Sequence, residues 1–111
     1  HYEKALAISP DSAKTLNNLA WSLVTVSDRS LRNGSRALQL AQQANNLAGA
    51  ADPFILNTLG AAYAETQQFD QAAEIERKAL DLATRSGDDA LAAEIRRVLL
   101  LYSSGTGYKR P

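Results

Sequence analysis

Few side chains in this sequence could carry out chemistry. The only histidine is His1, cysteine is absent, and no glycine-rich phosphate-binding loop occurs in the 111 residues. Nucleophilic and general acid–base catalysis need an activated nucleophile or a base of suitable pKa held close to the reacting group. The sequence offers no such set, so we expect a protein that is not an enzyme and that uses no cofactor.

Asp88 and Asp89 form the one adjacent acidic pair, which raises the question of a metal site. They follow Gly87 and precede a helical apolar pattern, where an aspartate caps the helix and interacts favourably with its dipole. Capping accounts for the pair, and we expect no metal site. The lack of cysteine also excludes a disulfide framework and a thiolate zinc site, and it leaves the cellular compartment unassigned.

The charge pattern argues against nucleic-acid and membrane partners. Twelve basic residues balance twelve acidic ones, so no net field attracts phosphate or an anionic surface. The basic tail 108–111 is too short for the several spread phosphate contacts that nucleic-acid binding requires. No apolar stretch approaches the roughly 20 residues of a membrane helix. We expect no nucleic-acid binding and no membrane contact by this segment, while an anchor upstream of residue 1 stays open.

Apolar residues recur at three- and four-residue spacing along the chain, which predicts an all-α fold. Asp11 or Ser12 can cap a first full helix, whose buried stripe is expected at Leu16, Leu19, Ala20 and Leu23. Caps, stops and apolar periodicity predict four further helices. They run from about Ser35 to a stop at Gly49, from Asp52-Pro53 through Tyr63, from Phe69 to about Ser86, and from Asp88 to Tyr102.

The stretch 56–79 carries the pattern of a tetratricopeptide repeat. The matching residues are Leu59, Gly60, Tyr63, Ala72 and Ala79, with Leu56 in place of the pattern's tryptophan. Small residues at 60 and 72 let the two helices of a hairpin approach closely, while the residues at 59, 63 and 79 fill the seam.

The intervals between matching residues extend the resemblance along the chain. Ala5 and Leu19 are 14 residues apart, as a repeat of about 34 residues requires. From Leu19 to Ala44 is 25 residues, against 20 from Leu59 to Ala79, so the middle repeat has five extra residues. Residues 1 to about 83 thus resemble the tetratricopeptide repeat family. The resemblance implies a solenoid of antiparallel helix hairpins.

The resemblance also implies how the chain is organised. Residues 1–103 would form one domain, followed by a tail at 104–111. Within the domain we expect a half repeat, a repeat with an extended inter-helix loop, a second repeat and a C-terminal capping helix, at 1–12, 13–52 (loop 27–34), 53–86 and 88–103.

In this family, partners bind on the concave face formed by the first helix of each repeat. Helical phase places ten candidates there: Lys14, Asn17, Trp21, Val24, Thr25, Phe54, Asn57, Ala61, Ala64 and Glu65. Asn17 and Asn57 occupy matching positions, and an amide can both donate to and accept from a peptide backbone. Trp21, the only tryptophan, suits recognition. The alternatives are that the two asparagines are simply solvated and that Trp21 packs against a neighbouring helix.

Some family members bind a C-terminal carboxylate with a clamp of two lysines, an arginine and asparagine. Here Lys14 and the two asparagines alone lie on the expected face, and Glu65 has the opposite charge. We therefore do not expect a carboxylate clamp.

These observations predict an interaction scaffold that holds a protein or peptide on its concave face. Two alternatives stay open. The half repeat would expose Leu6 and Ile8, an apolar surface that an identical chain could cover in a homodimer. The array could also be a regulatory arm of a larger enzyme or membrane protein, because a fold does not fix a function.

Overall fold

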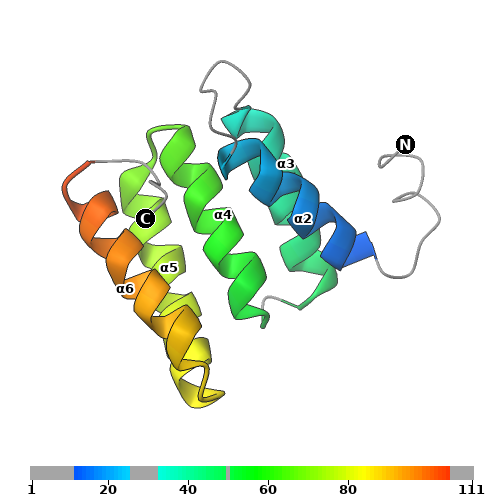
Figure 1. The fold of residues 1–111 in the computed structure, drawn as a ribbon. Helices are drawn as coiled ribbons and strands as arrows, with labels where there is room; N and C mark the ends of the chain where they lie inside the picture. The colour runs from blue at the N-terminus through cyan, green and yellow to red at the C-terminus, as the bar shows by residue number, and fades with distance from the viewer. Residues whose placement is uncertain (1–11, 26–32, 50, 106–111) are drawn as a thin grey trace.

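The computed structural model describes residues 12–25, 33–49 and 51–105. Within them 85% of the residues are helical and none is in a strand, which confirms the all-α prediction. The helices are α2 (Ser12–Thr25), α3 (Gly34–Leu47), α4 (Pro53–Glu65), α5 (Phe69–Arg85) and α6 (Asp89–Ser103) (Figure 1).

Several sequence-based predictions lie outside the described residues. They are the half repeat apart from Ser12, the cap at Asp11, the extended loop over 27–32, the tail beyond 105, and the dimer surface at Leu6 and Ile8.

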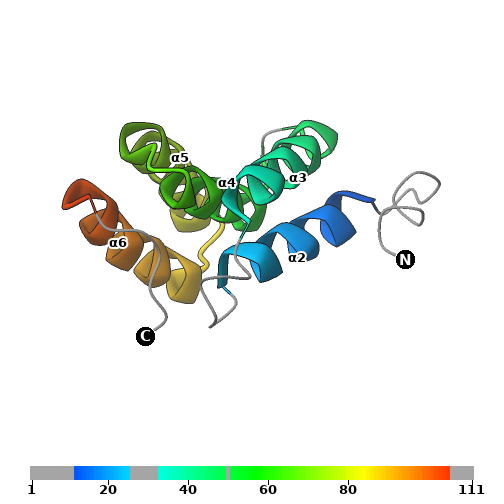
Figure 2. The same ribbon diagram turned by 90° about the horizontal axis from the view of Figure 1, so that it is seen from above.

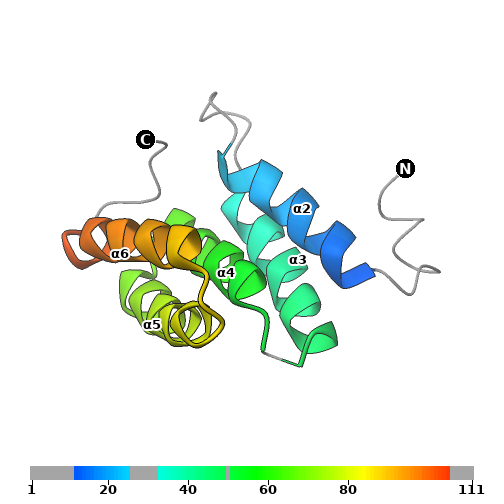
Figure 3. The ribbon, with the colours of Figure 1, turned by 60° about the horizontal axis from the view of Figure 1, so that its bottom comes forward.

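Each helix runs back along the one before it, and sequential helices pack against each other (Figure 1). The central helix α4 also contacts α2 and α6, which belong to different parts of the chain. Figure 2 shows α2 and α6 on one side of the molecule and α3 and α5 on the other. Figure 3 shows α4 lying between the α2–α3 pair and the α5–α6 pair. One face of the molecule is thus formed by α2, α4 and α6.

Polar side chains determine where three of the helices begin. Each accepts a hydrogen bond from a backbone N–H in the first turn, which satisfies a donor that the helix itself leaves unpaired. The bonds run from Arg36 N to Asn33 Oδ1 (3.0 Å), from Phe54 N to Asp52 Oδ1 (2.9 Å) and from Leu91 N to Asp88 Oδ1 (3.1 Å). The caps predicted at Asp52 and Asp88 are confirmed, and the sequence analysis missed the cap at Asn33.

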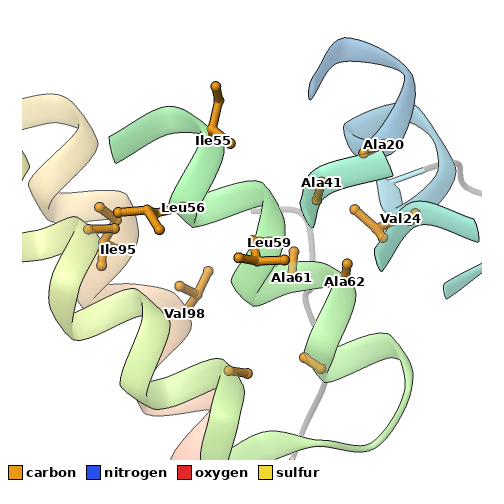
Figure 4. Close-up of a cluster of buried hydrophobic side chains, with 14 of the residues drawn as sticks. Ala20, Val24, Ala41, Ile55, Leu56, Leu59, Ala61, Ala62, Ile95 and Val98 are labelled. Carbon is orange, nitrogen blue, oxygen red and sulfur yellow. The ribbon is translucent and has the colours of Figure 1, made fainter. Parts of the chain in front are cut away.

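Helix α4 is apolar on nearly all sides, as expected of a helix surrounded by other helices. Its buried residues run almost without interruption through Ile55, Leu56, Asn57, Thr58, Leu59, Gly60, Ala61, Ala62 and Ala64. Figure 4 shows Leu56 beside Ile95 of α6, while Val24 of α2 and Ala41 of α3 lie on the opposite side of α4. The core therefore surrounds α4 rather than lying along one of its faces.

Helix α2 buries a stripe with four-residue spacing, formed by Leu16, Ala20 and Val24. Leu19 and Leu23, which were predicted to be buried, are only half-buried. Rows of residues four apart form the ridges that most often pack between helices, and Leu16, Ala20 and Val24 form such a row, to which Leu23 does not belong.

Helix α5 faces α4 with small residues and one carboxyl. Its buried positions are Ala72, Ala73, Glu76, Ala79 and Ala83. The larger Ile75, Leu80 and Leu82 are half-buried at its margins. Alanine at the contact lets the helix axes approach closely. Glu76 is the exception, and its surroundings belong to the candidate site.

Candidate binding groove

Two adjoining clefts lie on the face formed by α2, α4 and α6. One has a volume of about 720 Å³ and includes Lys14 and Asp52 in its lining. The other has a volume of about 340 Å³ and is lined in part by Trp21, Asn57, Thr58 and Leu91. Both clefts are lined by Asn17, Asn18 and Phe54, so they adjoin, and we call the pair the α2–α4 groove.

Half of the predicted groove residues line this surface. Lys14, Asn17, Trp21, Phe54 and Asn57 lie along it, contributed by α2 and α4. The sequence could place them because they lie within two turns of each other on each helix, where the helical phase drifts little.

The other five predicted groove residues do not line either cleft. Val24, Ala61 and Ala64 are buried in the core, because α2 packs against both α3 and α4 and because neighbouring helices cover α4. Thr25 is also buried, and its Oγ1 donates a hydrogen bond to the carbonyl of Trp21 at 2.7 Å. Glu65 is the last residue of α4 and lies against the start of α3, since a Cβ on Gly34 would lie 3.0 Å from the Glu65 Cβ.

Several residues that line the groove were not predicted from the sequence. Asn18 and Thr58 directly follow the predicted Asn17 and Asn57, so the groove takes two adjacent positions from one helical turn. Their adjacency to predicted groove residues could have been used to predict them from the sequence. Leu91 comes from α6, which was expected only to cap the array, and no local pattern places it near α2.

The groove combines an exposed aromatic ring with amide groups. Phe54 is 55% exposed although it belongs to the most buried helix of the molecule. Asn17 Oδ1 is buried and has no hydrogen-bond partner among the described residues. A buried acceptor without a donor costs free energy, which a donor on a ligand would recover. The groove therefore offers an apolar contact at Phe54 and, at Asn17, an amide whose oxygen lacks a donor and would have to turn outward to accept an incoming N–H.

Asn57 connects the groove to a buried carboxyl group. The Glu76 side chain is fully buried between α4 and α5. With the Asn57 amide oriented so that Nδ2 faces α5, Nδ2 donates to Glu76 Oε1 at 2.8 Å and to Oε2 at 2.9 Å. Asn57 thus contacts the carboxyl on one side and lines the groove on the other.

Burial raises the pKa of the Glu76 carboxyl well above its usual range, because the charged form loses its hydration. The carboxylate of Glu94 on α6 raises this pKa further by repulsion. Glu94 is itself paired with Arg97, at 2.6 Å from Glu94 Oε1 to Arg97 Nη2. The molecule therefore holds a carboxyl that takes up a proton more readily than an exposed glutamate does.

Within the described part of the chain, no three histidine, cysteine, aspartate or glutamate side chains gather as metal ligands would. Among the described helices, none combines the length and apolar character needed to cross a bilayer.

No protein-family model matches this chain, no curated protein is significantly similar to it, and no solved structure matches it. Its function must therefore be argued from its own residues and geometry.

Proposed function

We propose that this chain is a tetratricopeptide-type helical scaffold that binds an extended peptide segment of a partner protein in the α2–α4 groove, and that it catalyses no reaction. The observation that carries the proposal is the groove itself. It comprises two adjoining clefts, it is lined by the exposed side chain of Phe54, and it is lined by Asn17, whose Oδ1 has no partner among the described residues.

The packing of the pattern residues supports the repeat assignment. Leu59, Gly60, Ala72 and Ala79 are all buried where α4 and α5 meet, as close packing of a repeat hairpin requires. Tyr63 is half-buried, and its hydroxyl accepts a hydrogen bond from Gln42 Nε2 of α3 at 3.2 Å. This bond links the second hairpin to the first.

The chemistry of the groove favours an extended peptide over a small charged ligand. A peptide backbone presents N–H and C=O groups at regular intervals, which amides such as Asn17 and Asn57 can bind without desolvating a charge. Aromatic rings such as Phe54 and Trp21 provide contact area for apolar side chains. Among the described residues that line the groove, the only charged ones are Lys14 and Asp52, which have opposite signs, so the described lining does not favour a strongly charged segment.

A selection from a random peptide library tests the proposal. Peptides enriched on the 111-residue chain should quench or shift the fluorescence of Trp21, since it is the only tryptophan and lines the groove. Asn17→Ala should weaken binding of these peptides about threefold to tenfold, the effect of one lost hydrogen bond. Asn46→Ala, at an exposed position on α3, serves as the matched control. Enriched peptides that bind both variants as they bind the wild type would place the site elsewhere and refute the proposal.

A further inference from the structure

Asn57 has two neighbours of different character, the Glu76 carboxyl and the groove. The two ends of its amide have the same shape but opposite hydrogen-bonding roles, because the oxygen only accepts and the NH₂ only donates. Asn57 also lines the groove, so we take the end that does not face Glu76 to be the one that a groove ligand meets. The hydrogen-bonding state of Glu76 can therefore control whether Asn57 presents a donor or an acceptor to a ligand in the groove.

An ionised carboxylate only accepts hydrogen bonds. Facing it, Asn57 must present Nδ2, in the geometry of 2.8 Å and 2.9 Å to the two carboxylate oxygens. The amide oxygen is then the end left for a ligand in the groove, and it would accept an N–H from a peptide backbone.

A neutral carboxyl has an O–H that needs an acceptor. The nearest side-chain amide is that of Asn57, which can present its oxygen by a half turn about the bond between Cβ and Cγ. The NH₂ group then faces the groove and donates to a peptide carbonyl. The proton comes from solvent, and no other bond changes.

We propose that Glu76 is a positioning residue that acts through Asn57, so that its protonation state decides whether the groove offers a peptide backbone an acceptor or a donor at position 57. This inference rests on the proposed function for the identity of the ligand. The orientation of the amide is a property of the free protein and can be tested without a ligand.

The surroundings of Glu76 leave protonation as the simplest way to neutralise it. From α4 it is faced by Asn57 and Gly60, neither of which titrates. From α6 the charged group that acts on it is Glu94, which is of the same sign and is already paired with Arg97. On α5 itself, Arg77 and Lys78 are exposed, directed away from the buried face. The raised pKa of Glu76 follows from this setting and brings its titration closer to neutral pH.

The test begins with NMR on the free chain. We expect the side-chain NH₂ signals of Asn57 to titrate with the same midpoint as the carboxyl carbon of Glu76, above the usual glutamate value of about 4.3. In Glu76→Gln the Asn57 signals should become independent of pH. Glu94→Gln, the matched control, should lower the shared midpoint without abolishing the titration, because it removes only the repulsion. Asn57 signals that stay constant while the Glu76 carbon titrates would overturn the inference.

The second arm uses a blocked penta-alanine peptide, which has no titratable group. Its Kd, measured from shifts of Asn17 and Trp21 signals, should differ about threefold to tenfold between pH values below and above the Glu76 midpoint, the effect of one hydrogen bond. In Glu76→Gln this difference should disappear. A wild-type Kd that does not change with pH would overturn the inference and leave the proposed function standing. If no groove signal shifts with any peptide, the proposed function fails, and the Asn57 titration still decides the orientation.

Discussion

A Cβ placed on Gly60 of α4 would lie 2.5 Å from Oε2 of Glu76 on α5, and 2.8 Å from its Cγ and Cδ. Real Cβ contacts are essentially never so short. The buried carboxyl therefore packs directly against the backbone of α4, and only glycine leaves room for it. Gly60 is required for space rather than for an unusual backbone angle, since it lies within a regular helix.

Gly60→Ala should destabilise the fold by about 1–3 kcal/mol, the usual cost of overpacking a core. Alanine is the better helix former by about 1 kcal/mol, so an exposed site would show the opposite sign. Urea denaturation of both proteins measures the difference. In a Glu76→Ala background the added methyl group meets no carboxyl, and the same substitution should become neutral or stabilising. An equal loss in both backgrounds would show that the Glu76 contact is not the cause.

Glu76 should also make the stability of the fold depend on pH. Its pKa is raised in the folded state by burial, while in the unfolded chain it returns to about 4.3. Between these two values the folded state binds more protons, so the free energy of unfolding falls as the pH rises. The contribution is complete below the unfolded pKa and is lost as the pH rises to the folded one.

Glu76→Gln should therefore raise the Tm at neutral pH and remove this part of the pH dependence. The substitution keeps the shape of the side chain and removes the buried charge. Thermal melts across acidic to neutral pH measure the effect. Glu74→Gln, at an exposed position of the same helix, should reproduce the wild-type curve. Parallel curves for the wild type and Glu76→Gln would contradict the assignment.

The helices could be predicted because their signals are local. Caps such as Asp52 and Asp88 act within one turn, and apolar periodicity is read from neighbouring residues. It was harder to predict which residues of each helix are buried and which are exposed. Val24, Ala61 and Ala64 are buried because neighbouring helices pack over them, and helix–helix packing depends on residues far apart in the sequence.

The burial of Glu76 was missed for a different reason. It continues the series Ala72, Ala73, Ala79 and Ala83 at helical spacing, so its position in the buried register was readable. It was not predicted to be buried, because glutamate is usually found at the surface. Recognising that Gly60 leaves space opposite requires the pairing of α4 with α5.

The N-cap of α6 provides a prediction independent of the groove. Asp88→Ala should destabilise the fold by about 1 kcal/mol, because Asp88 Oδ1 accepts the hydrogen bond from Leu91 N at 3.1 Å. Asp88→Asn keeps an acceptor and should retain most of the stability. Asp89→Ala is the matched control, since Asp89 is exposed and lies one residue inside the helix. Denaturant titration ranks the three variants, and an equal loss for Asp88→Ala and Asp89→Ala would argue for a general charge effect instead of a cap.

Phe54 and Leu47 provide the sharpest contrast between binding and folding. Both are large apolar side chains at the surface, 55% and 60% exposed, but only Phe54 lines the groove. Truncating either one to alanine should change the free energy of unfolding by roughly 0.5 kcal/mol or less, as is usual for exposed positions. Phe54→Ala should weaken binding of library-selected peptides by about 1 kcal/mol or more, because it removes an aromatic contact. Leu47→Ala should leave binding unchanged. Calorimetric titration and thermal melts separate the two effects, and equal affinities of the two variants would mean that the ring of Phe54 is not part of the binding surface.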